Sequence, residues 1–364
     1  MADRYSEYRA VAGQLGVSAV ALVPGPNFMR LLHKDFHVNE RPLVVVIPQS
    51  GPPAAIVPNL ELSSFALVKF EGEVFDWRDQ TGYQGAFDAL ARSMPLDSLA
   101  VEGQTMRVFV HHAFAAANKG IRITDGEKAI SSLRICKSPD EIKILEEAIR
   151  ISEAALHDTL EQVRVGLTEA QVEQILAQAL FAHGAEGFAF RPIVAADDNS
   201  ARAHATARAD YRIAAGDALL LDFGARWGGF CADVTRTVFV GEPGAEARDV
   251  YATVLAANAK AREITRPGLT AHEVDDAVIS ILEASAYADR IRTKTGHGLG
   301  RAIHEEPYIM RGNQQVLRAG MVFTDEPGLY RLGGFGVRIE DDILVTESGC
   351  RSLTTFPREI MIVG

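Results

Sequence analysis

Short apolar runs bounded by proline and glycine fill the first third of the chain. Residues 17–24, 42–47 and 54–58 are runs of this kind, and each predicts a buried strand. Residues 87–94 instead have the spacing of a helix. Because short strands and helices alternate, we expect an α/β unit over residues 1–130, with the polar stretch 124–128 as the linker that follows it.

Longer helical patterns begin after this stretch, and each starts with a capping signal. Ser138 is followed by proline and, three residues on, by Glu141, which predicts a capping box and a helix running to about Val163. A second helix is predicted to start at Thr168, where Gln171 completes a similar box.

Two pairs of carboxylates each flank a glycine-rich turn. Asp222 and Asp233 lie on either side of a Gly-Gly sequence, and Glu326 and Glu340 lie at equal distances from Gly333. In a symmetric hairpin the two members of each pair would face each other across the strands, where like charges are destabilising. A bound cation between them would remove that objection.

His297 lies between the two predicted hairpins, flanked by glycines. Four carboxylates and one imidazole form a hard, oxygen-rich ligand set with room for two divalent ions. Two such ions about 3.5–4 Å apart can share a hydroxide and stabilise both ends of a hydrolytic transition state. The competing interpretation is a set of solvated acids and a loop histidine, and the presence of two symmetric pairs argues against it.

The sequence Gly-Leu-Thr occurs at residues 166–168 and again at 268–270, in each case after an alanine-rich helical pattern and before another predicted helix. This repeat predicts a duplicated half made of helices followed by antiparallel strands. Each half would contribute one acidic hairpin, which places the site at a pseudo-twofold interface.

Composition and charge narrow the class of protein. A chain of 364 residues is long for one core, so two domains are expected. The net charge of −11, with no basic face, argues against a nucleic-acid partner. Three scattered cysteines, a polar N-terminus and the lack of a 20-residue apolar run predict a cytoplasmic protein without membrane contact.

The five candidate ligands and their surroundings resemble those of the pita-bread metallopeptidase family, which includes methionine aminopeptidase, aminopeptidase P and prolidase. The matching contexts are Asp-Phe-Gly, Asp-Val-Thr-Arg-Thr, Gly-His-Gly, Glu-Pro-Gly-Leu-Tyr and Val-Arg-Ile-Glu-Asp-Asp. The resemblance implies an α+β fold. Residues 131–364 would form the pita-bread catalytic domain with its pseudo-twofold repeat, and residues 1–130 a smaller α/β, creatinase-like N-terminal domain that is typical of the prolidase and aminopeptidase P branch.

The resemblance also implies further site residues. His204 and His304 match the family's substrate-binding histidines, which would donate to the substrate carbonyl or the developing oxyanion. Glu326 would act as the catalytic proton carrier besides being a ligand. Arg338 lies on the same strand face as the last ligand and can pair with the site carboxylates, and Tyr330 would line the pocket.

Two positions depart from the family pattern. Thr293 stands where many relatives have a histidine, and Tyr308 stands where small prolidases often have an arginine that reads the carboxylate of a dipeptide. Arg311 follows three residues later and could replace that arginine. Both changes leave the metal chemistry alone and leave the preferred peptide length open.

We therefore expect a dinuclear, metal-dependent hydrolase of Xaa-Pro peptide bonds, an Xaa-Pro dipeptidase (prolidase) acting on proline-containing peptides as a homodimer. Mn²⁺ is the first candidate for the two ions, and the ligands also admit Co²⁺, Zn²⁺ or Fe²⁺. An Xaa-Pro aminopeptidase (aminopeptidase P) acting on longer peptides is the alternative. Creatinase-like amidinohydrolases, ectoine-derivative hydrolases, certain sulfonium lyases and non-catalytic binding relatives share the scaffold, since a fold does not fix a substrate. The intact ligand set disfavours metal-free creatinase chemistry and a binding relative.

Overall fold

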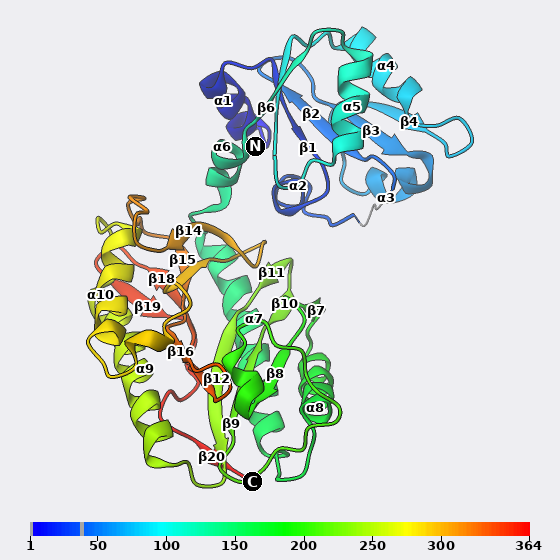
Figure 1. The fold of residues 1–364 in the computed structure, drawn as a ribbon. Coiled ribbons are helices and arrows are strands. Elements are labelled where there is room, and N and C mark those ends of the chain that lie inside the picture. Colours follow the sequence, from blue (N-terminus) through cyan, green and yellow to red (C-terminus); the bar gives the residue numbers. More distant parts are fainter. Residues whose placement is uncertain (1–2, 37–39) are drawn as a thin grey trace. The chain divides into compact units, whose positions relative to one another are not determined.

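The computed structural model describes residues 3–36 and 40–364. The chain forms two compact units, of which the first ends at Arg134 and the second begins at Ile135 (Figure 1). From the sequence we expected this boundary four residues earlier, after residue 130.

The predicted linker at residues 124–128 is wrong, because these residues belong to the first unit. They lie in β6 (Arg122–Asp125) and α6 (Glu127–Ser131). Gly126 donates its N–H to the Val101 carbonyl at 2.8 Å, and Asp125 accepts the N–H groups of Gly103 and Glu127. The polar side chains of this stretch therefore satisfy backbone groups at the end of a sheet.

The first unit contains a six-stranded mixed sheet in which the three predicted apolar runs are confirmed as strands. The strand order is β4-β3-β2-β1-β5-β6, with β1 (Ala19–Leu22), β2 (Val44–Pro48), β3 (Ala54–Pro58), β4 (Glu73–Trp77) and β5 (Ser98–Val101). The helices of this unit are α1 (Ser6–Leu15), α2 (Pro26–Leu32), α3 (Leu62–Ala66), α4 (Gln84–Ser93), α5 (Val108–Ala117) and α6. The predicted helix at 87–94 corresponds to α4.

Alternate residues of each central strand pack into two separate clusters, as the two-residue period of a strand requires. Val20 and Val45 join the cluster that contains α1 and α2 side chains, whereas Ala21 and Val44 join the cluster of Phe87 from α4 and its neighbours. Both faces of the sheet are therefore covered, which explains why the strands read as continuous apolar runs.

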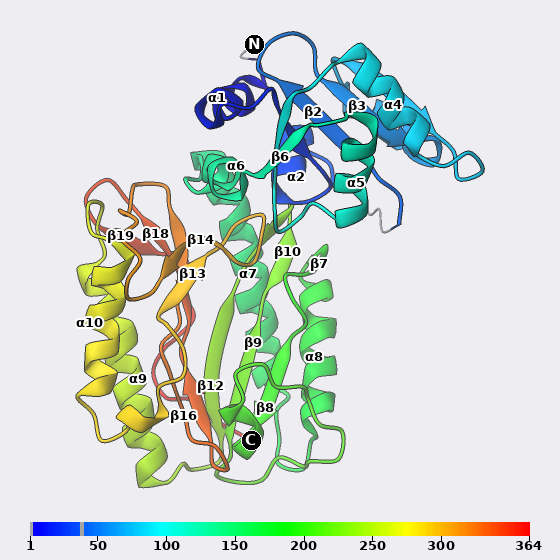
Figure 2. The ribbon, with the colours of Figure 1, turned by 45° about the horizontal axis from the view of Figure 1, so that its top comes forward.

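The second unit has two pairs of packed helices, with strands between the pairs (Figures 1 and 2). The first pair is α7 (Pro139–Leu160) and α8 (Glu169–Ala182), and the second is α9 (Ala245–Ile264) and α10 (Ala271–Glu283). The capping box predicted at Ser138 is confirmed, since its hydroxyl accepts the N–H of Glu141 while the Glu141 carboxylate accepts the N–H of Ser138.

The predicted internal repeat is visible in the local structure of the two halves. Thr168 caps α8 and Thr270 caps α10, each within a complete capping box. Gly166 and Gly268 have φ values of 93° and 92°, in the region that favours glycine. The same turn thus leads into the second helix of each half.

Antiparallel strands dominate the second unit and bring its two halves together. A four-stranded sheet has the order β20-β12-β9-β8, and a five-stranded sheet has the order β14-β13-β15-β18-β19. Their bounds are β8 (Ile193–Ala196), β9 (Ala218–Phe223), β12 (Val234–Val240), β13 (Gly296–Gly298), β14 (Glu305–Ile309), β15 (Val322–Asp325), β18 (Asp341–Val345), β19 (Cys350–Ser352) and β20 (Ile362–Val363). Two shorter sheets contain β7 (Gly187–Phe188), β10 (Ala225–Trp227) and β11 (Phe230–Cys231), and β16 (Gly328–Tyr330) with β17 (Gly336–Arg338).

Helix pairs packed around antiparallel strands make the second unit an α+β structure, as predicted. Among the described residues, no helix combines the length and apolar character that a membrane crossing requires.

Candidate metal centre

The first acidic hairpin is centred one residue beyond the predicted midpoint, so the residue that faces Asp222 lies two positions after Asp233. In the β9–β12 ladder Asp222 faces Thr235, and in β10–β11 Trp227 faces Phe230. The loop is the Gly-Gly pair itself, with φ values of 57° and 76°, because this two-residue turn needs positive φ at both positions. Asp222 and Asp233 are therefore diagonal neighbours rather than opposite residues, and they stay on one face of the sheet.

The second hairpin has the predicted register. Gly328 faces Arg338 in β16–β17, and Asp325 faces Asp341 in β15–β18, so both ladders are centred on Gly333. This register places Glu326 opposite Glu340. Both residues leave the ladder locally, since the Glu326 N–H donates to the Thr295 carbonyl at 2.7 Å and the Glu340 N–H to the Thr235 carbonyl at 3.1 Å. The second hairpin is thus tied to the first one.

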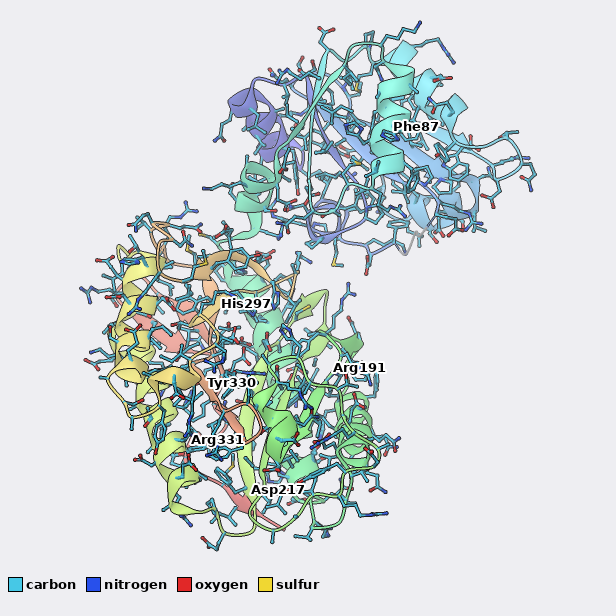
Figure 3. All side chains as sticks on the ribbon, viewed as in Figure 1. Phe87, Arg191, Asp217, His297, Tyr330 and Arg331 are labelled. Atoms are coloured by element: carbon cyan, nitrogen blue, oxygen red, sulfur yellow. The ribbon has the colours of Figure 1, made fainter. Side chains whose placement is uncertain are left out.

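Buried ligand-type atoms from both halves converge at this point. Ligand atoms of Asp233, His297 and Glu340 all lie within 4.8 Å of one another. The Nε2 atom of His297 is 3.3 Å from Glu326 Oε1 and 3.7 Å from Asp233 Oδ2. Figure 3 shows His297 in the upper part of the second unit, between the two helix pairs. Asp222 forms an ion pair with Arg338, which also donates to the hydroxyl of Thr235, and that hydroxyl in turn donates to Glu340.

Neighbouring groups orient these side chains. His297 Nδ1 lies 3.1 Å from the carbonyl oxygen of Gly298, so it takes the donor role and leaves the Nε2 lone pair facing the acids. The hydroxyl of Thr324 accepts the His297 N–H at 3.0 Å and donates to Glu326 at 3.1 Å. Thr235 donates to Glu340 in the same way. The ligand set is thus held in place by hydroxyl groups and backbone.

The buried carboxyl groups of the cluster would be stabilised in their charged forms by a bound cation. Burial, and then the neighbouring Glu340, raise the pKa of Asp233 well above its usual range, and burial raises the pKa of Glu326 to about 7. Burial lowers the pKa of His297 to about 3, so this imidazole is neutral and available as a ligand. Asp222 Oδ1 is buried with no hydrogen-bond partner. These observations fit divalent cations held by carboxylate oxygens and one imidazole nitrogen.

The cluster opens into a cavity of about 570 Å³. Besides the five predicted ligands, it is lined by His204, His304 and Arg338, all three of which the sequence analysis had singled out. The rings of His297 and His304 are 4.0 Å apart between centroids. The cavity therefore brings the predicted ligands and the predicted substrate-binding histidines into one space.

Three other predicted site residues are not among the described residues that line this cavity. Tyr330 is buried behind it and accepts a hydrogen bond of 2.8 Å from Arg338. Arg311 binds Glu283 and Asp276 on α10, at 2.6 Å and 2.8 Å. The ring of Tyr308, on β14, is 5.7 Å from the ammonium group of Lys294.

Sequence reasoning missed several residues of the cavity, including Phe190, Ile193, Arg292 and Lys294. The first two follow β7 and begin β8, where an apolar residue carries no sign of a site. Lys294 comes three residues before His297, next to the Thr293 position that departs from the family pattern. That departure was the available signal.

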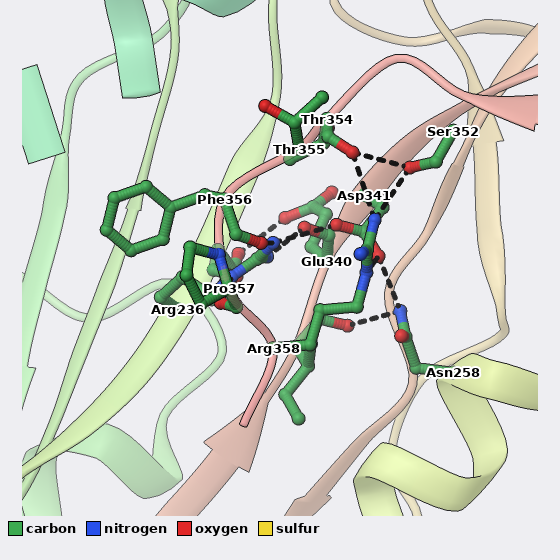
Figure 4. Close-up of polar contacts among 12 residues, drawn as sticks. Arg236, Asn258, Glu340, Asp341, Ser352, Thr354, Thr355, Phe356, Pro357 and Arg358 are labelled. Carbon is green, nitrogen blue, oxygen red and sulfur yellow. Dashed lines mark hydrogen bonds and ion pairs between the residues drawn. The ribbon is translucent and has the colours of Figure 1, made fainter. Parts of the chain in front are cut away.

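Three arginines surround the buried carboxylate of Asp341, next to the metal centre (Figure 4). Asp341, adjacent to Glu340, accepts hydrogen bonds from Arg236 at 2.8 Å, Arg262 at 2.9 Å and Arg358 at 2.5 Å. Arg236 also donates to the backbone carbonyls of Thr235 and Glu340. Although burial alone would raise the pKa of Asp341, the guanidinium groups of Arg236 and Arg358 lower it. These hydrogen bonds hold the backbone of Glu340 and Asp341 in place and so position the Glu340 side chain.

Comparison with known proteins identifies relatives of the chain. The sequence profile of metallopeptidase family M24 matches residues 143–347. An Xaa-Pro dipeptidase from Pyrococcus furiosus is 39% identical over 65% of this chain and 67% of its own length. The solved structure of a prolidase from Thermococcus sibiricus is similar with a TM-score of 0.93 and 33% identity, covering 99% and 98% of the two chains. An X-Pro aminopeptidase from Thermotoga maritima is similar with a TM-score of 0.82 and 29% identity, covering 97% and 100%.

The profile matches more than half of the chain, and the similarity to the solved structures extends over nearly all of it. The ligand series, the repeated halves and these matches agree with one another. The chain therefore belongs to metallopeptidase family M24, with the pita-bread fold of that family, and it is a hydrolase that works with divalent metal ions.

Proposed function

We propose that this enzyme is an Xaa-Pro dipeptidase with two divalent metal ions per chain, Mn²⁺ being the first candidate. The observation that carries the proposal is the convergence of four acids and the free Nε2 of His297 in one buried cluster. The Xaa-Pro dipeptidase and prolidase among its relatives support the reaction. The homodimer and the cytoplasmic location stay predictions from the sequence.

Asp222, Asp233, His297, Glu326 and Glu340 would hold the ions. When bound, the ions supply Lewis acidity and lower the pKa of the attacking water. Asp233, Glu326 and Glu340 keep their charge in that state because the added positive charge offsets the burial that otherwise favours their neutral forms.

Glu326 is suited to carry the proton. Its side chain is 17% exposed, the largest fraction among the four acids. A carboxylate at the open side of the cluster can accept the proton of the attacking water and release it afterwards. The proline nitrogen leaves poorly unless it is protonated, and Glu326 would deliver that proton.

His204 and His304 would stabilise the oxyanion that forms on the scissile carbonyl. Both line the cavity beside the ligands. Burial, and next the charge of Lys294, lower the pKa of His304, so its imidazole is neutral and can offer one N–H as a donor. Donors placed in this way contribute most where charge develops in the transition state.

A second candidate function is an Xaa-Pro aminopeptidase that cleaves longer peptides. The observation that favours it is the position of Arg311, whose guanidinium binds the acids of α10 instead of entering the cavity. If no other cation of the cavity binds the dipeptide carboxylate, a longer peptide would bind equally well.

The decisive experiment compares Ala-Pro, Ala-Pro-Ala and Ala-Ala as substrates of the chelated enzyme reloaded with Mn²⁺. We expect cleavage of Ala-Pro above the other two, with about two ions bound per chain by mass spectrometry. Asp233→Ala and Glu340→Ala should lose bound metal and nearly all activity, whereas Asp210→Ala, an exposed acid elsewhere in this unit, should not. Near-wild-type turnover in both ligand variants would refute the dinuclear site, and equal cleavage of Ala-Pro and Ala-Pro-Ala would favour the aminopeptidase.

A further inference from the structure

The cationic side chains that line the cavity differ in their burial and in their hydrogen-bond and ion-pair partners. Arg338 is buried and its guanidinium is fully engaged, because it pairs with Asp222 and donates to Tyr330 and Thr235. Arg292 is exposed and donates to the carbonyls of Asp289 and Ile291. These two guanidinium groups already have partners.

Lys294 differs from both. It is half-buried at the cavity wall, and among the described residues its ammonium group forms no hydrogen bond and no ion pair, whereas Arg292 donates to two backbone carbonyls. Its contact is with the ring of Tyr308, whose centroid lies 5.7 Å from Nζ, within the range of a cation–π interaction. Tyr308 thus holds the ammonium group at the cavity edge. Tyr308 itself occupies the sequence position at which small prolidases often have an arginine.

The net charge of the cavity with two metal ions bound determines which substrate groups Lys294 can attract. Two divalent ions would balance the four ligand carboxylates, and Arg292, Lys294 and Arg338 would then leave the cavity with excess positive charge. An anionic substrate group can enter such a cavity, whereas a neutral one gains nothing from Lys294. In a dipeptide the terminal carboxylate is only two bonds from the leaving nitrogen, so the residue that reads it must reach into this same cavity. Lys294 lines that cavity, and Arg311 is not among its lining residues.

We infer that Lys294 binds the free C-terminal carboxylate of the substrate and makes the enzyme selective for dipeptides. The inference rests on the proposed Xaa-Pro activity. It adds the residue that distinguishes dipeptides from longer peptides. The lysine offers a point charge instead of the planar fork of an arginine, so one oxygen of the carboxylate suffices for binding. Tyr308 acts as a positioning residue for the ammonium group.

The test compares Ala-Pro with its C-terminal amide, which has the same shape and no negative charge. Wild-type enzyme should prefer the acid. Lys294→Met should raise KM for Ala-Pro by about 10- to 100-fold, with kcat nearly unchanged and little effect on the amide. Lys294→Arg should keep most of the preference. Lys260→Met, which removes a lysine paired with Glu263 on α9, is the matched control and should behave like wild type.

A binding measurement provides a readout independent of turnover. Calorimetry of the Mn²⁺-loaded protein should show L-proline binding more tightly than L-prolinamide, and Lys294→Met should abolish that difference while metal content stays the same. If wild-type enzyme treats acid and amide alike, or if Arg311→Met and not Lys294→Met removes the preference, the inference is wrong and the Xaa-Pro activity still stands. If no Xaa-Pro bond is cleaved at all, the proposed function itself fails.

Discussion

At the scale of single residues, the metal centre holds carboxyl groups whose folded environment favours the protonated form when no metal is bound. Burial raises the pKa of Glu326 to about 7, and it raises the pKa of Asp233 and Glu340 well above their usual range. A carboxyl group with a raised folded pKa stabilises the fold at low pH and loses that contribution as pH rises. For Glu326 the loss falls between about pH 4.5 and pH 7. The metal-free protein should therefore be less stable at pH 8 than at pH 5.

Thermal unfolding of the chelated protein at both pH values measures this effect. Glu326→Gln has nothing to titrate at this position, so the fall in Tm from pH 5 to pH 8 should be smaller than in wild type by about 5 °C. Added Mn²⁺ should raise Tm more at pH 8 than at pH 5, since metal ligands must be deprotonated. The same pH dependence in wild type and variant would contradict the raised pKa.

The order and the contexts of the ligand residues made the centre predictable, because they carry the family's spacing and glycine flanks. The residue proposed to bind the C-terminal carboxylate of the substrate was harder to predict. The direction of Arg311 is set by Glu283 and Asp276, which lie 28 and 35 residues earlier on α10, and no local pattern shows that contact. Lys294 sits in a loop, where a lysine has no periodicity that could mark it.

At the scale of elements, the repeated Gly-Leu-Thr turns make a paired prediction. The hydroxyls of Thr168 and Thr270 each accept the N–H of the third helical residue at 3.2 Å. Thr168→Ala and Thr270→Ala should each lower the free energy of unfolding by about 1 kcal/mol, measured with urea. Thr→Ser at either position keeps the acceptor and should cost much less. A loss at one site and none at the other would show that the two caps are not equivalent.

The two acidic hairpins show what a strand pattern can and cannot predict. Gly333 is at the centre of the second hairpin, and the predicted pairing of Glu326 with Glu340 agrees with the register found. In the first hairpin the carboxylates are not symmetric about the turn, because the backbone needs both glycines at the two positive-φ positions. Turn geometry therefore set the register, and the position of the acids did not. The mistaken linker has a similar origin, since polar residues can cap a sheet as well as connect domains.

At the scale of the whole molecule, each unit has its own hydrophobic clusters. Phe87 lies in the first unit (Figure 3) and is fully buried. It packs edge-on against Phe114, with 4.9 Å between ring centroids. Phe239 is fully buried in the second unit, 6.1 Å from the ring of Tyr251. A hydrophobic core in each unit allows the two units to fold separately. Such division into domains becomes common in chains longer than about 250–300 residues.

We therefore expect two unfolding transitions that can be shifted independently. Phe87→Ala should destabilise the first unit by about 3–5 kcal/mol because it leaves a cavity in that core. Phe239→Ala should act equally strongly on the second unit. Scanning calorimetry with and without Mn²⁺ assigns the transitions, since only the unit that holds the metal ligands should be stabilised by the ion. Phe87→Ala should lower the metal-insensitive transition and leave the other in place. A single transition that both variants lower together would show instead that the two units unfold as one.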